Sequence, residues 1–252
     1  DEVDILVSPT ASTGTDDEVQ LCRRLATSRR VDAIIITSPK PNDERIRLLH
    51  ELGMPFLVHG RSDTDIPHAW LDIDNEGAVY RSTAHLLDLG HTHIAMINGR
   101  YGFTFSLHRD AGYRKALEEK GVVFDPELVE HGDFTDEVGY RLAKKLLERN
   151  PRPTAFVAGS MMTALGIYRA ARSLGLTIGK DLSVIAHDDV ISFLSADNMV
   201  PSLTATRSSM RAAGKRCADL LMDMLDGRVA SDVNELWPVE LILRETAVRA
   251  PK

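Results

Sequence analysis

Short apolar runs alternate with longer amphipathic stretches along most of the chain. The apolar runs lie near residues 3–8, 33–37, 55–59, 93–98, 127–131, 154–158 and 183–187. Helical patterns lie between them, near residues 16–30, 43–52, 75–89, 107–120, 136–149 and 161–174. Apolar runs this short, without polar alternation, are typical of parallel strands covered on both faces. The pattern therefore predicts an α/β fold with parallel sheets flanked by helices.

The alternation of helix, strand, loop and helix is especially clear between His85 and Gly121. Gly90 ends a leucine-rich helical stripe, and the apolar residues 94–97 form the next strand. An exposed loop then leads to Arg109 at the start of the following helix. Because open parallel sheets bind ligands outside the carboxyl ends of their strands, we expect the functional site at this loop and at the ends of neighbouring strands.

A break in the spacing predicts two half-sheets. Residues 69–77, AWLDIDNEG, form a strand that runs directly into an acidic helix start. Further along, Met210, Cys217 and Leu221 recur at helical spacing and Gly227 follows them, which predicts a helix over 210–225.

The composition is that of an ordinary globular protein. With 252 residues and 43% hydrophobic residues, the chain can form a sizeable core in one large domain or two modest ones. No apolar run approaches the roughly 18 residues of a membrane span. The first residues lack the basic and apolar regions of a signal peptide, so we expect a cytoplasmic protein. The net charge of −7 argues against binding of nucleic acid by these 252 residues alone.

The motifs of common enzyme classes are missing from the sequence. The histidines are scattered without metal-ligand spacing, and neither a GxSxG nucleophile elbow nor a glycine-rich phosphate loop occurs. Cys22 and Cys217 each lie among apolar neighbours, as small core residues do. We therefore expect no catalytic residue, no metal and no cofactor.

Five segments carry a resemblance to a known family. They are LGHTHIA (89–95), RDAGY (109–113), LSVIAHDD (182–189), PSLT (201–204) and LWPVELILRE (236–245). Together they resemble the effector-binding core of the lactose-repressor/galactose-repressor (LacI/GalR) family of bacterial transcription regulators, over nearly the whole chain.

The resemblance implies a two-lobed, periplasmic-binding-protein-like fold of type I, with three crossovers between the lobes near residues 74–75, 201–204 and 228–235. The N-terminal lobe would comprise residues 1–74 and 203–233, and the C-terminal lobe residues 75–202 and 234–252. A last strand, over residues 236–245, would return the chain to the C-terminal lobe. Family cores begin with a strand and a helix ahead of the segment that matches 3–8, and a DNA-binding headpiece precedes those. We therefore expect a segment before Asp1, a homodimer, and operator DNA as a partner reached only through that headpiece.

Arg109 and Asp188 are the strongest candidates for ligand contacts. A planar guanidinium suits two adjacent hydroxyls or a carboxylate, although an ion pair with Asp110 or Glu118 would also explain Arg109. Asp188 and Asp189 follow an apolar strand, and adjacent residues on an extended chain point apart, which disfavours a paired-carboxylate catalytic or metal site. The resemblance implies that Arg109 and Asp188 contact the effector and leaves Asp189 to local structure.

Aromatic residues in two loops are candidates for a wall of the same site. Phe134 lies between a strand and a helix, and Phe103 lies in the loop after strand 93–98, beside Tyr101 and Phe105. The apolar face of a sugar stacks on aromatic rings, but packing beneath the loops would explain at least one of these residues. The resemblance implies an aromatic effector contact at Phe134.

Two departures from the family pattern bear on the ligand. Ser160 and Met161 stand where the family usually has Asn and Asp, which predicts a roomier pocket with Ser160 as a small hydroxyl contact. His59, at the end of strand 55–59, replaces an aspartate that is common nearby. With Trp70, these residues are most similar to the α-glucoside-type regulators of the family.

The sequence thus predicts the effector-binding and dimerisation core of a LacI-type regulator, in which closure of two lobes on a sugar, α-glucoside-like, controls operator binding. A freestanding sugar-binding protein of a transport system shares the fold and is the main alternative. A sugar-processing α/β enzyme and a purine effector are the further alternatives.

Overall fold

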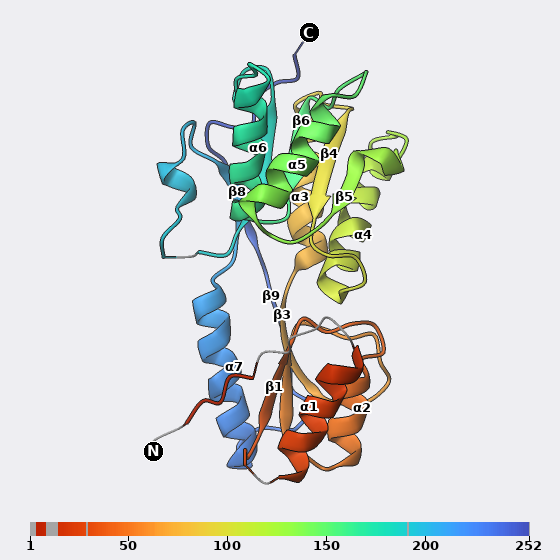
Figure 1. Cartoon of the computed structure of the whole chain (residues 1–252), viewed down its shortest axis with the longest axis vertical. Helices are drawn as coiled ribbons and strands as arrows, with labels where there is room; N and C mark the ends of the chain where they lie inside the picture. The colour runs from red at the N-terminus through yellow and green to blue at the C-terminus, as the bar shows by residue number, and fades with distance from the viewer. Residues whose placement is uncertain (1–3, 9–14, 29, 191, 252) are drawn as a thin grey trace. The chain divides into compact units, whose positions relative to one another are not determined.

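The computed structural model describes residues 4–8, 15–28, 30–190 and 192–251. The chain forms two compact units (Figure 1). Unit 1 comprises Asp1–Asp72 and Ala213–Leu236, and unit 2 comprises Ile73–Ala212 and Trp237–Lys252. The chain therefore passes from one unit to the other three times. The bounds of the two lobes expected above remain a prediction.

Unit 1 is built on a four-stranded sheet. Its strands lie in the order β1 (Ile34–Thr37), β2 (Phe56–His59), β3 (Ala69–Ile73) and β9 (Asn234–Trp237). Strands β1, β2 and β3 run parallel. Helices α1 (Thr15–Thr27) and α2 (Glu44–Glu51) and the adjoining strands bury a core that includes Cys22, Ile46 and Val58.

Unit 2 holds a six-stranded sheet in the order β10-β8-β7-β6-β4-β5. Its strands are β4 (Ile94–Asn98), β5 (Val129–His131), β6 (Ala155–Ala158), β7 (Ser183–Asp188), β8 (Thr204–Arg207) and β10 (Glu240–Ile242). Neighbours run parallel except β10, which lies antiparallel to β8 at one edge. The helices are α3 (Asn75–Asp88), α4 (Thr104–Glu119), α5 (Asp136–Leu147) and α6 (Met161–Ser173), with 3-10 helices at Pro126–Leu128 and Ala196–Asn198. Helix α7 (Met210–Leu225) follows β8 and spans the boundary between the units.

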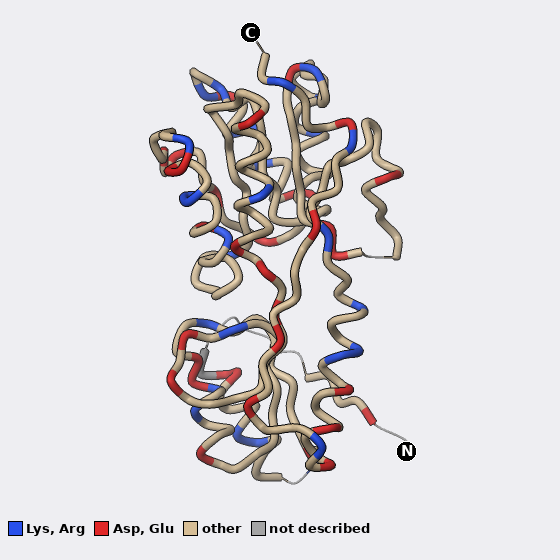
Figure 2. The backbone as a smooth tube through the Cα atoms, turned by 180° about the vertical axis from the view of Figure 1, so that it is seen from behind, with Lys and Arg blue, Asp and Glu red and all other residues tan. Residues whose placement is uncertain are grey.

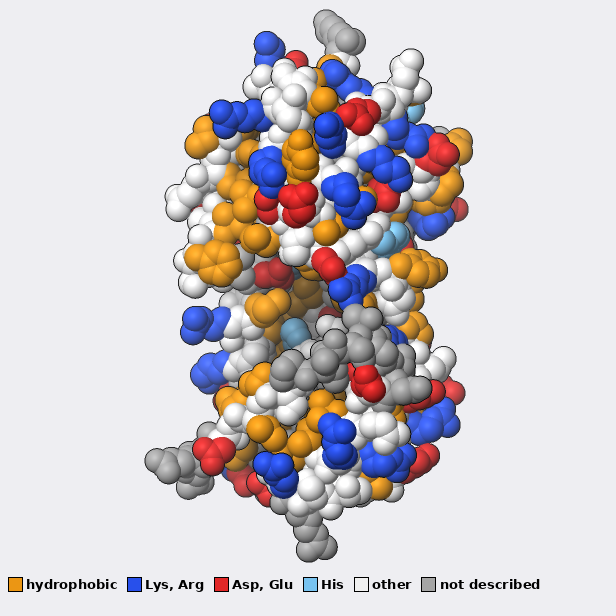
Figure 3. Space-filling model, in the orientation of Figure 1, with side chains coloured by type: hydrophobic (Ala, Val, Ile, Leu, Met, Phe, Trp, Pro, Cys, Tyr) orange, Lys and Arg blue, Asp and Glu red, His pale blue; other side chains and the backbone are white. Residues whose placement is uncertain are grey.

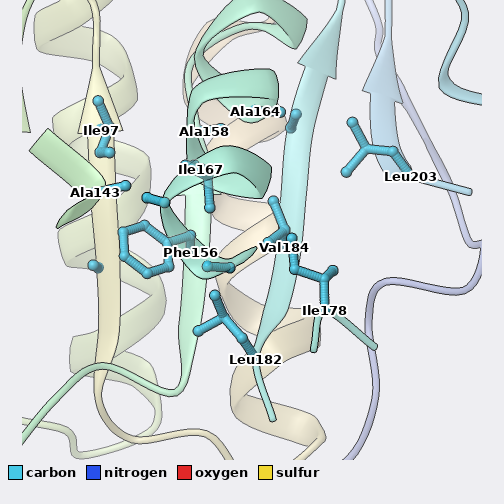
Figure 4. Packing of buried hydrophobic residues seen from close by; sticks show 14 of the residues in the cluster. Ile97, Ala143, Phe156, Ala158, Ala164, Ile167, Ile178, Leu182, Val184 and Leu203 are labelled. Atoms are coloured by element: carbon cyan, nitrogen blue, oxygen red, sulfur yellow. The ribbon is translucent and has the colours of Figure 1, made fainter. Parts of the chain in front are cut away.

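Side chains of the central strands in unit 2 alternate between two separate cores. Along β4, Ile94 and Met96 pack with α3 and α4, while Ala95 and Ile97 pack with α5 and α6. Figure 4 shows Phe156 of β6 within the second of these cores. This burial on both faces explains why the strands lack polar alternation, and it confirms the predicted α/β architecture.

Glycines let the helices of each pair approach closely. A Cβ added to Gly112 of α4 would lie 2.1 Å from the backbone oxygen of Glu76 in α3. One added to Gly166 of α6 would lie 2.3 Å from the backbone oxygen of Asp136 in α5. A larger residue at either position would have to push two backbones apart, so glycine is required by the close approach.

Two predicted strands differ in the structure. Residues 4–8 of the predicted strand 3–8 lie outside any strand and are exposed, with Ile5 85% accessible; residue 3 lies outside the described part. A strand needs backbone hydrogen bonds to a neighbour, and among the described residues none reaches this segment. The predicted strand 236–245 is divided between β9 and β10, because Pro238 between them has no N–H to donate.

The helix predicted over residues 107–120 begins earlier, at Thr104. Arg109 therefore lies in the second turn of α4, and the prediction that it opens the helix is wrong. Phe103 is the N-cap residue, and its side chain makes no capping hydrogen bond. This start is hard to predict, because the N-cap position holds Phe103 rather than the Ser, Thr, Asp or Asn that usually marks one.

Acidic and basic side chains are mixed over both units. Figure 2 shows them interleaved along the backbone, and Figure 3 shows them side by side on one face. Many form ion pairs between neighbouring elements, such as Lys120 with Asp88 and Lys145 with Glu130. On the face that Figure 3 shows, this mixture differs from the clustered basic surface that phosphate binding requires. Among the described residues, no helix is long and apolar enough to cross a membrane.

Candidate functional site

The carboxyl ends of β4, β6 and β7 meet at one edge of the unit 2 sheet. Asn98 ends β4, Gly159 directly follows β6, and Asp188 ends β7. Five of the predicted ligand-binding residues belong to this unit: Phe103, Arg109, Phe134, Ser160 and Asp188. We call the neighbourhood of these strand ends the unit 2 site.

Arg109 reaches the unit 2 site from the second turn of α4. Its side chain is buried, with 4% of the residue exposed. Nε donates to Oδ1 of Asn75 over 2.8 Å, and Nη1 donates to the backbone oxygen of Gly159 over 2.7 Å. The guanidinium carbon lies 5.3 Å from the ring centre of Phe105 and 5.7 Å from that of Phe134. The contacts orient a cationic hydrogen-bond donor at the ends of the parallel strands.

The carboxylate of Asp188 lies at the end of β7 and is almost completely buried. Its Oδ1 accepts a hydrogen bond of 2.8 Å from the backbone N–H of Val190. Val190 has φ of 55°, a left-handed conformation that a β-branched residue rarely adopts. Oδ2 lies 4.0 Å from Nε of Arg207, beyond hydrogen-bond distance. Asp188 therefore both shapes the loop after β7 and places a carboxylate at the unit 2 site.

The residues on either side of Asp188 have structural contacts. The ring of His187 is hydrogen-bonded to Thr206 and Ser208, and its Nε2 lies 3.3 Å from Oδ1 of Asp189. Burial lowers the pKa of His187, which favours the neutral ring. These contacts tie the end of β7 to the segment that leads into α7. No feature of the sequence pattern indicates this role for His187.

Three phenylalanine rings form a row beside Arg109. Phe103 and Phe105 have ring centres 6.0 Å apart, as do Phe105 and Phe134. All three rings are half-buried. A Cβ at Gly159 would lie 2.6 Å from the ring of Phe134, so the glycine at the end of β6 makes room for that ring. From the sequence, Phe105 is a weaker candidate than Phe134, as are Tyr101 and Phe103, yet its ring contacts Arg109.

Ser160 has a structural task that the sequence did not reveal. Its Oγ accepts a 3.1 Å hydrogen bond from the backbone N–H of Thr163 and lies 3.1 Å from the Thr163 hydroxyl. Ser160 is thus the N-cap of α6. Met161 is buried in the adjoining core. Ser160 remains a predicted ligand contact, but its hydroxyl is already used to start the helix.

Asp110 of α4 forms a hydrogen-bonded group with Asn98 at the end of β4 and His131 at the end of β5. Asp110 accepts hydrogen bonds from Nδ2 of Asn98 and from Nε2 of His131, rather than from Arg109. The carboxylate of Asp110 is thus engaged by Asn98 and His131, and the guanidinium of Arg109 by Asn75 and Gly159. The one signal that pointed to this group was the position of Asn98 at the end of an apolar strand.

His59 belongs to unit 1, where it ends β2 and is half-buried. Nearby in sequence, Nε of Arg61 donates to Oδ2 of Asp72 over 2.9 Å. The Arg61 guanidinium carbon lies 5.7 Å from the ring centre of Trp70. The role of His59 as a ligand contact remains a prediction.

The chemistry of the unit 2 site is that of binding. It combines an oriented guanidinium, a carboxylate and the faces of aromatic rings, which together suit a ligand with hydroxyl groups and an apolar face. Among the described residues, no group of three or more His, Cys, Asp or Glu side chains could hold a metal ion.

Comparisons with known proteins agree with this architecture. A family model for a periplasmic binding protein-like domain matches residues 83–247. The HTH-type transcriptional regulator AglR of Rhizobium meliloti (strain 1021) is 45% identical over 239 residues, which cover 94% of this chain and 67% of that protein. The chain spans about two thirds of the length of the curated relatives it matches.

Two solved structures extend the comparison to bound molecules. The complex of the transcriptional regulator CelR with cellobiose has a TM-score of 0.81 at 29% identity, covering 92% of this chain and 70% of that chain. The lac repressor dimer bound to operator and the anti-inducer ONPF has a TM-score of 0.81 at 26% identity, covering 94% of this chain and 80% of that chain.

Proposed function

This chain belongs to the LacI family of transcriptional regulators, and from that membership we propose that it is the sugar-sensing, dimerising core of such a regulator. A sugar effector would bind at the unit 2 site and alter the affinity for operator DNA. Contact with DNA would be made by a headpiece outside these 252 residues. A protein with this task works in the cytoplasm.

The geometry around Arg109 carries the proposal. Its guanidinium is buried, oriented by Asn75 and Gly159, and flanked by the rings of Phe105 and Phe134. Sugars present adjacent hydroxyls that accept from such a fork, together with an apolar face that stacks on aromatic rings. At the end of β7 a carboxylate, that of Asp188, would accept hydrogen bonds from further hydroxyls.

The effector we propose is an α-glucoside. The CelR complex supports a sugar made of more than one ring, because cellobiose is the ligand of that protein. Ser160 and Met161 stand where the family usually has Asn and Asp. A small hydroxyl and an apolar side chain therefore replace an amide and a carboxylate, so a ligand would have fewer protein polar groups to hydrogen-bond here. The preference for the α-anomer rests on the resemblance at His59 and Trp70.

Regulation requires that the sugar bind one arrangement of the two lobes better than another, because equal affinity would shift no equilibrium. The lac repressor structure, a dimer on its operator, supports a dimer of this chain as the unit that responds. The curated relatives are regulators rather than transport proteins or enzymes, which favours the regulator over both alternatives.

Thermal unfolding of the chain with a panel of ligands tests the proposal. The panel consists of maltose, sucrose, trehalose, cellobiose, glucose 6-phosphate and hypoxanthine. A ligand at 100 times its Kd stabilises the folded state by about 2.7 kcal/mol. For a chain of this size that corresponds to a rise in Tm of about 5 to 10 °C. We expect maltose or another α-glucoside to produce this rise.

Two variants of α4 connect the rise to the unit 2 site. Arg109→Ala should abolish the ligand-induced rise in Tm. Arg114→Ala removes an arginine from the same helix, at an exposed position over the ring of Phe124, and should leave the rise unchanged. A rise in Tm with hypoxanthine alone would refute the proposal that the effector is a sugar. A ligand-induced rise in Tm that is unchanged in Arg109→Ala would refute the proposal that the ligand binds at the unit 2 site.

A further inference from the structure

The loops that carry two of the phenylalanines follow neighbouring strands. Strand β4 pairs with β5, and Asn98 lies opposite His131 in the ladder. The loop after β4 leads to Phe103, and the loop after β5 leads to Phe134. The spacing of the two loops therefore contributes to the distance between the two rings.

The side chain of Asn98 uses both hydrogens of its amide to hold the loop after β4. Nδ2 donates to the backbone oxygen of Ser106 over 2.9 Å and to Oδ1 of Asp110 over 2.8 Å. Oδ1 of Asn98 accepts from the backbone N–H of Gly99 over 2.8 Å. Asn98 is only 1% exposed, so these bonds are protected from water. They fasten the beginning of the loop to the first turns of α4.

The same carboxylate holds the end of β5. Nε2 of His131 lies 3.0 Å from Oδ2 of Asp110 and 3.2 Å from Oδ1. Because an ionised carboxylate can only accept, this nitrogen carries the hydrogen and donates it. The two side chains are 22% and 16% exposed. The ring of Tyr101, from the loop after β4, packs edge-on against the His131 ring at 5.4 Å.

A second link between the loops is more exposed. Arg100, in the loop after β4, forms an ion pair with Asp133, in the loop after β5. Both side chains are 46% exposed, and ion pairs so open to water contribute little. The less exposed contacts of Asp110 are therefore the stronger of the two links.

We propose that Asp110 is a positioning residue of the unit 2 site. By accepting from Asn98 and His131 at once, it fixes the spacing of the two loops and hence of Phe103 and Phe134. Arg109, one residue earlier on α4, contacts the ring of Phe134, so one helical turn orders both the guanidinium and the rings. The consequence for sugar binding rests on the proposed function, whereas the spacing of the loops does not.

Ring resonances of 13C-labelled phenylalanine in the 252-residue chain test the spacing directly. Asp110→Leu removes the acceptor and keeps the branched outline of the side chain, and we expect the resonances of Phe103 and Phe134 to move. His131→Gln, a single variant, keeps an N–H donor toward Asp110 and should leave both phenylalanine resonances at their wild-type positions. Arg100→Gln breaks only the exposed link and is the matched control. Phe156, in the buried core, reports whether each variant is folded.

The proposal would be overturned if the resonances of Phe103 and Phe134 stayed in place in Asp110→Leu. It would also be overturned if Arg100→Gln moved these two resonances as far as Asp110→Leu does. If the Phe156 signal shows that Asp110→Leu does not fold, His131→Phe decides instead. It removes the donor and keeps a ring for Tyr101 to contact. It should move the same two resonances, and unchanged positions would overturn the proposal.

Binding of maltose and cellobiose, measured by calorimetry, connects the spacing to the site. We expect Asp110→Leu to bind the sugar that the wild type binds about tenfold more weakly, or about 1.4 kcal/mol. His131→Gln should bind it within about twofold, a difference of about 0.4 kcal/mol. Equal binding by Asp110→Leu would overturn the positioning role. If the wild type binds neither sugar, the α-glucoside proposal loses support, while the ring resonances still decide on Asp110.

Discussion

Gly112→Ala should destabilise unit 2 through the contact between α3 and α4. The new Cβ would lie 2.1 Å from the backbone oxygen of Glu76 and 3.0 Å from the backbone N of Tyr80. Both are backbone atoms of a helix and cannot rotate away as the end of a side chain could. The two helices would have to separate by roughly 1 Å to restore ordinary van der Waals contact.

Two opposing effects determine the size of the change. Alanine in place of glycine within a helix favours folding by about 1 kcal/mol. Overpacking a close contact usually costs about 1 to 3 kcal/mol, and a backbone clash this short lies at the upper end. We therefore expect a net loss of about 2 kcal/mol, which lowers the Tm by about 4 to 8 °C for a chain of this size.

Gly214→Ala provides the matched control for this experiment. Gly214 lies in α7, and a Cβ there would meet nothing within 4 Å. The same substitution should therefore show only the gain in helix propensity, up to about 1 kcal/mol of added stability. Scanning calorimetry of the two variants beside the wild type measures both changes under the same conditions.

The two variants should thus move the Tm in opposite directions. If Gly112→Ala were as stable as the wild type, the close approach of α3 and α4 would not constrain the fold as we argue. The same separation would also strain the hydrogen bond between Asn75 of α3 and Arg109 of α4. Gly112→Ala should for this reason weaken the stabilisation by an α-glucoside, and Gly214→Ala should leave it unchanged.

Three further predictions concern pH, a helix cap and a buried ion pair. Because burial lowers the pKa of His187 in the folded state, the unfolded chain binds more protons, and stability should fall as the pH drops below 6.5, the ordinary value. His187→Gln should reduce this loss in urea titrations at pH 7.5 and 5.5, and an equal loss would contradict the assignment. Ser160→Ala should lower stability by about 1 kcal/mol by removing the cap of α6, detectable as a lower urea midpoint with an unchanged slope. Asp43→Ala should cost about 3 kcal/mol, because it removes the carboxylate at 2.6 Å from the buried guanidinium of Arg45 and leaves the more distant one of Glu18 at 3.6 Å; calorimetry giving less than about 1 kcal/mol would show that Glu18 or water replaces the lost carboxylate.

The sequence determined the elements of this protein and the edge of the sheet where the unit 2 site lies. The apolar runs became strands because their residues are buried on both faces, and periodicity reports that burial directly. Asp188 at the end of β7 followed from the same pattern, because parallel strands share one carboxyl edge. Periodicity alone does not identify Arg109 as a candidate ligand contact, because it places Arg109 at a helix start that the structure does not have. That assignment depends on the family resemblance as well.

Contacts between distant segments were decided only by the tertiary structure. Nothing local to Asp110 indicates that its carboxylate joins the ends of β4 and β5. The sequence pattern predicts a ligand contact at Ser160, and only the structure shows that its hydroxyl caps α6. Residues 4–8 show the same limit, because an apolar run becomes a strand only beside a neighbour that completes its hydrogen bonds. Periodicity is a property of one segment and its own burial. Hydrogen bonds between side chains depend on which segments pack together, and that is settled by the whole fold.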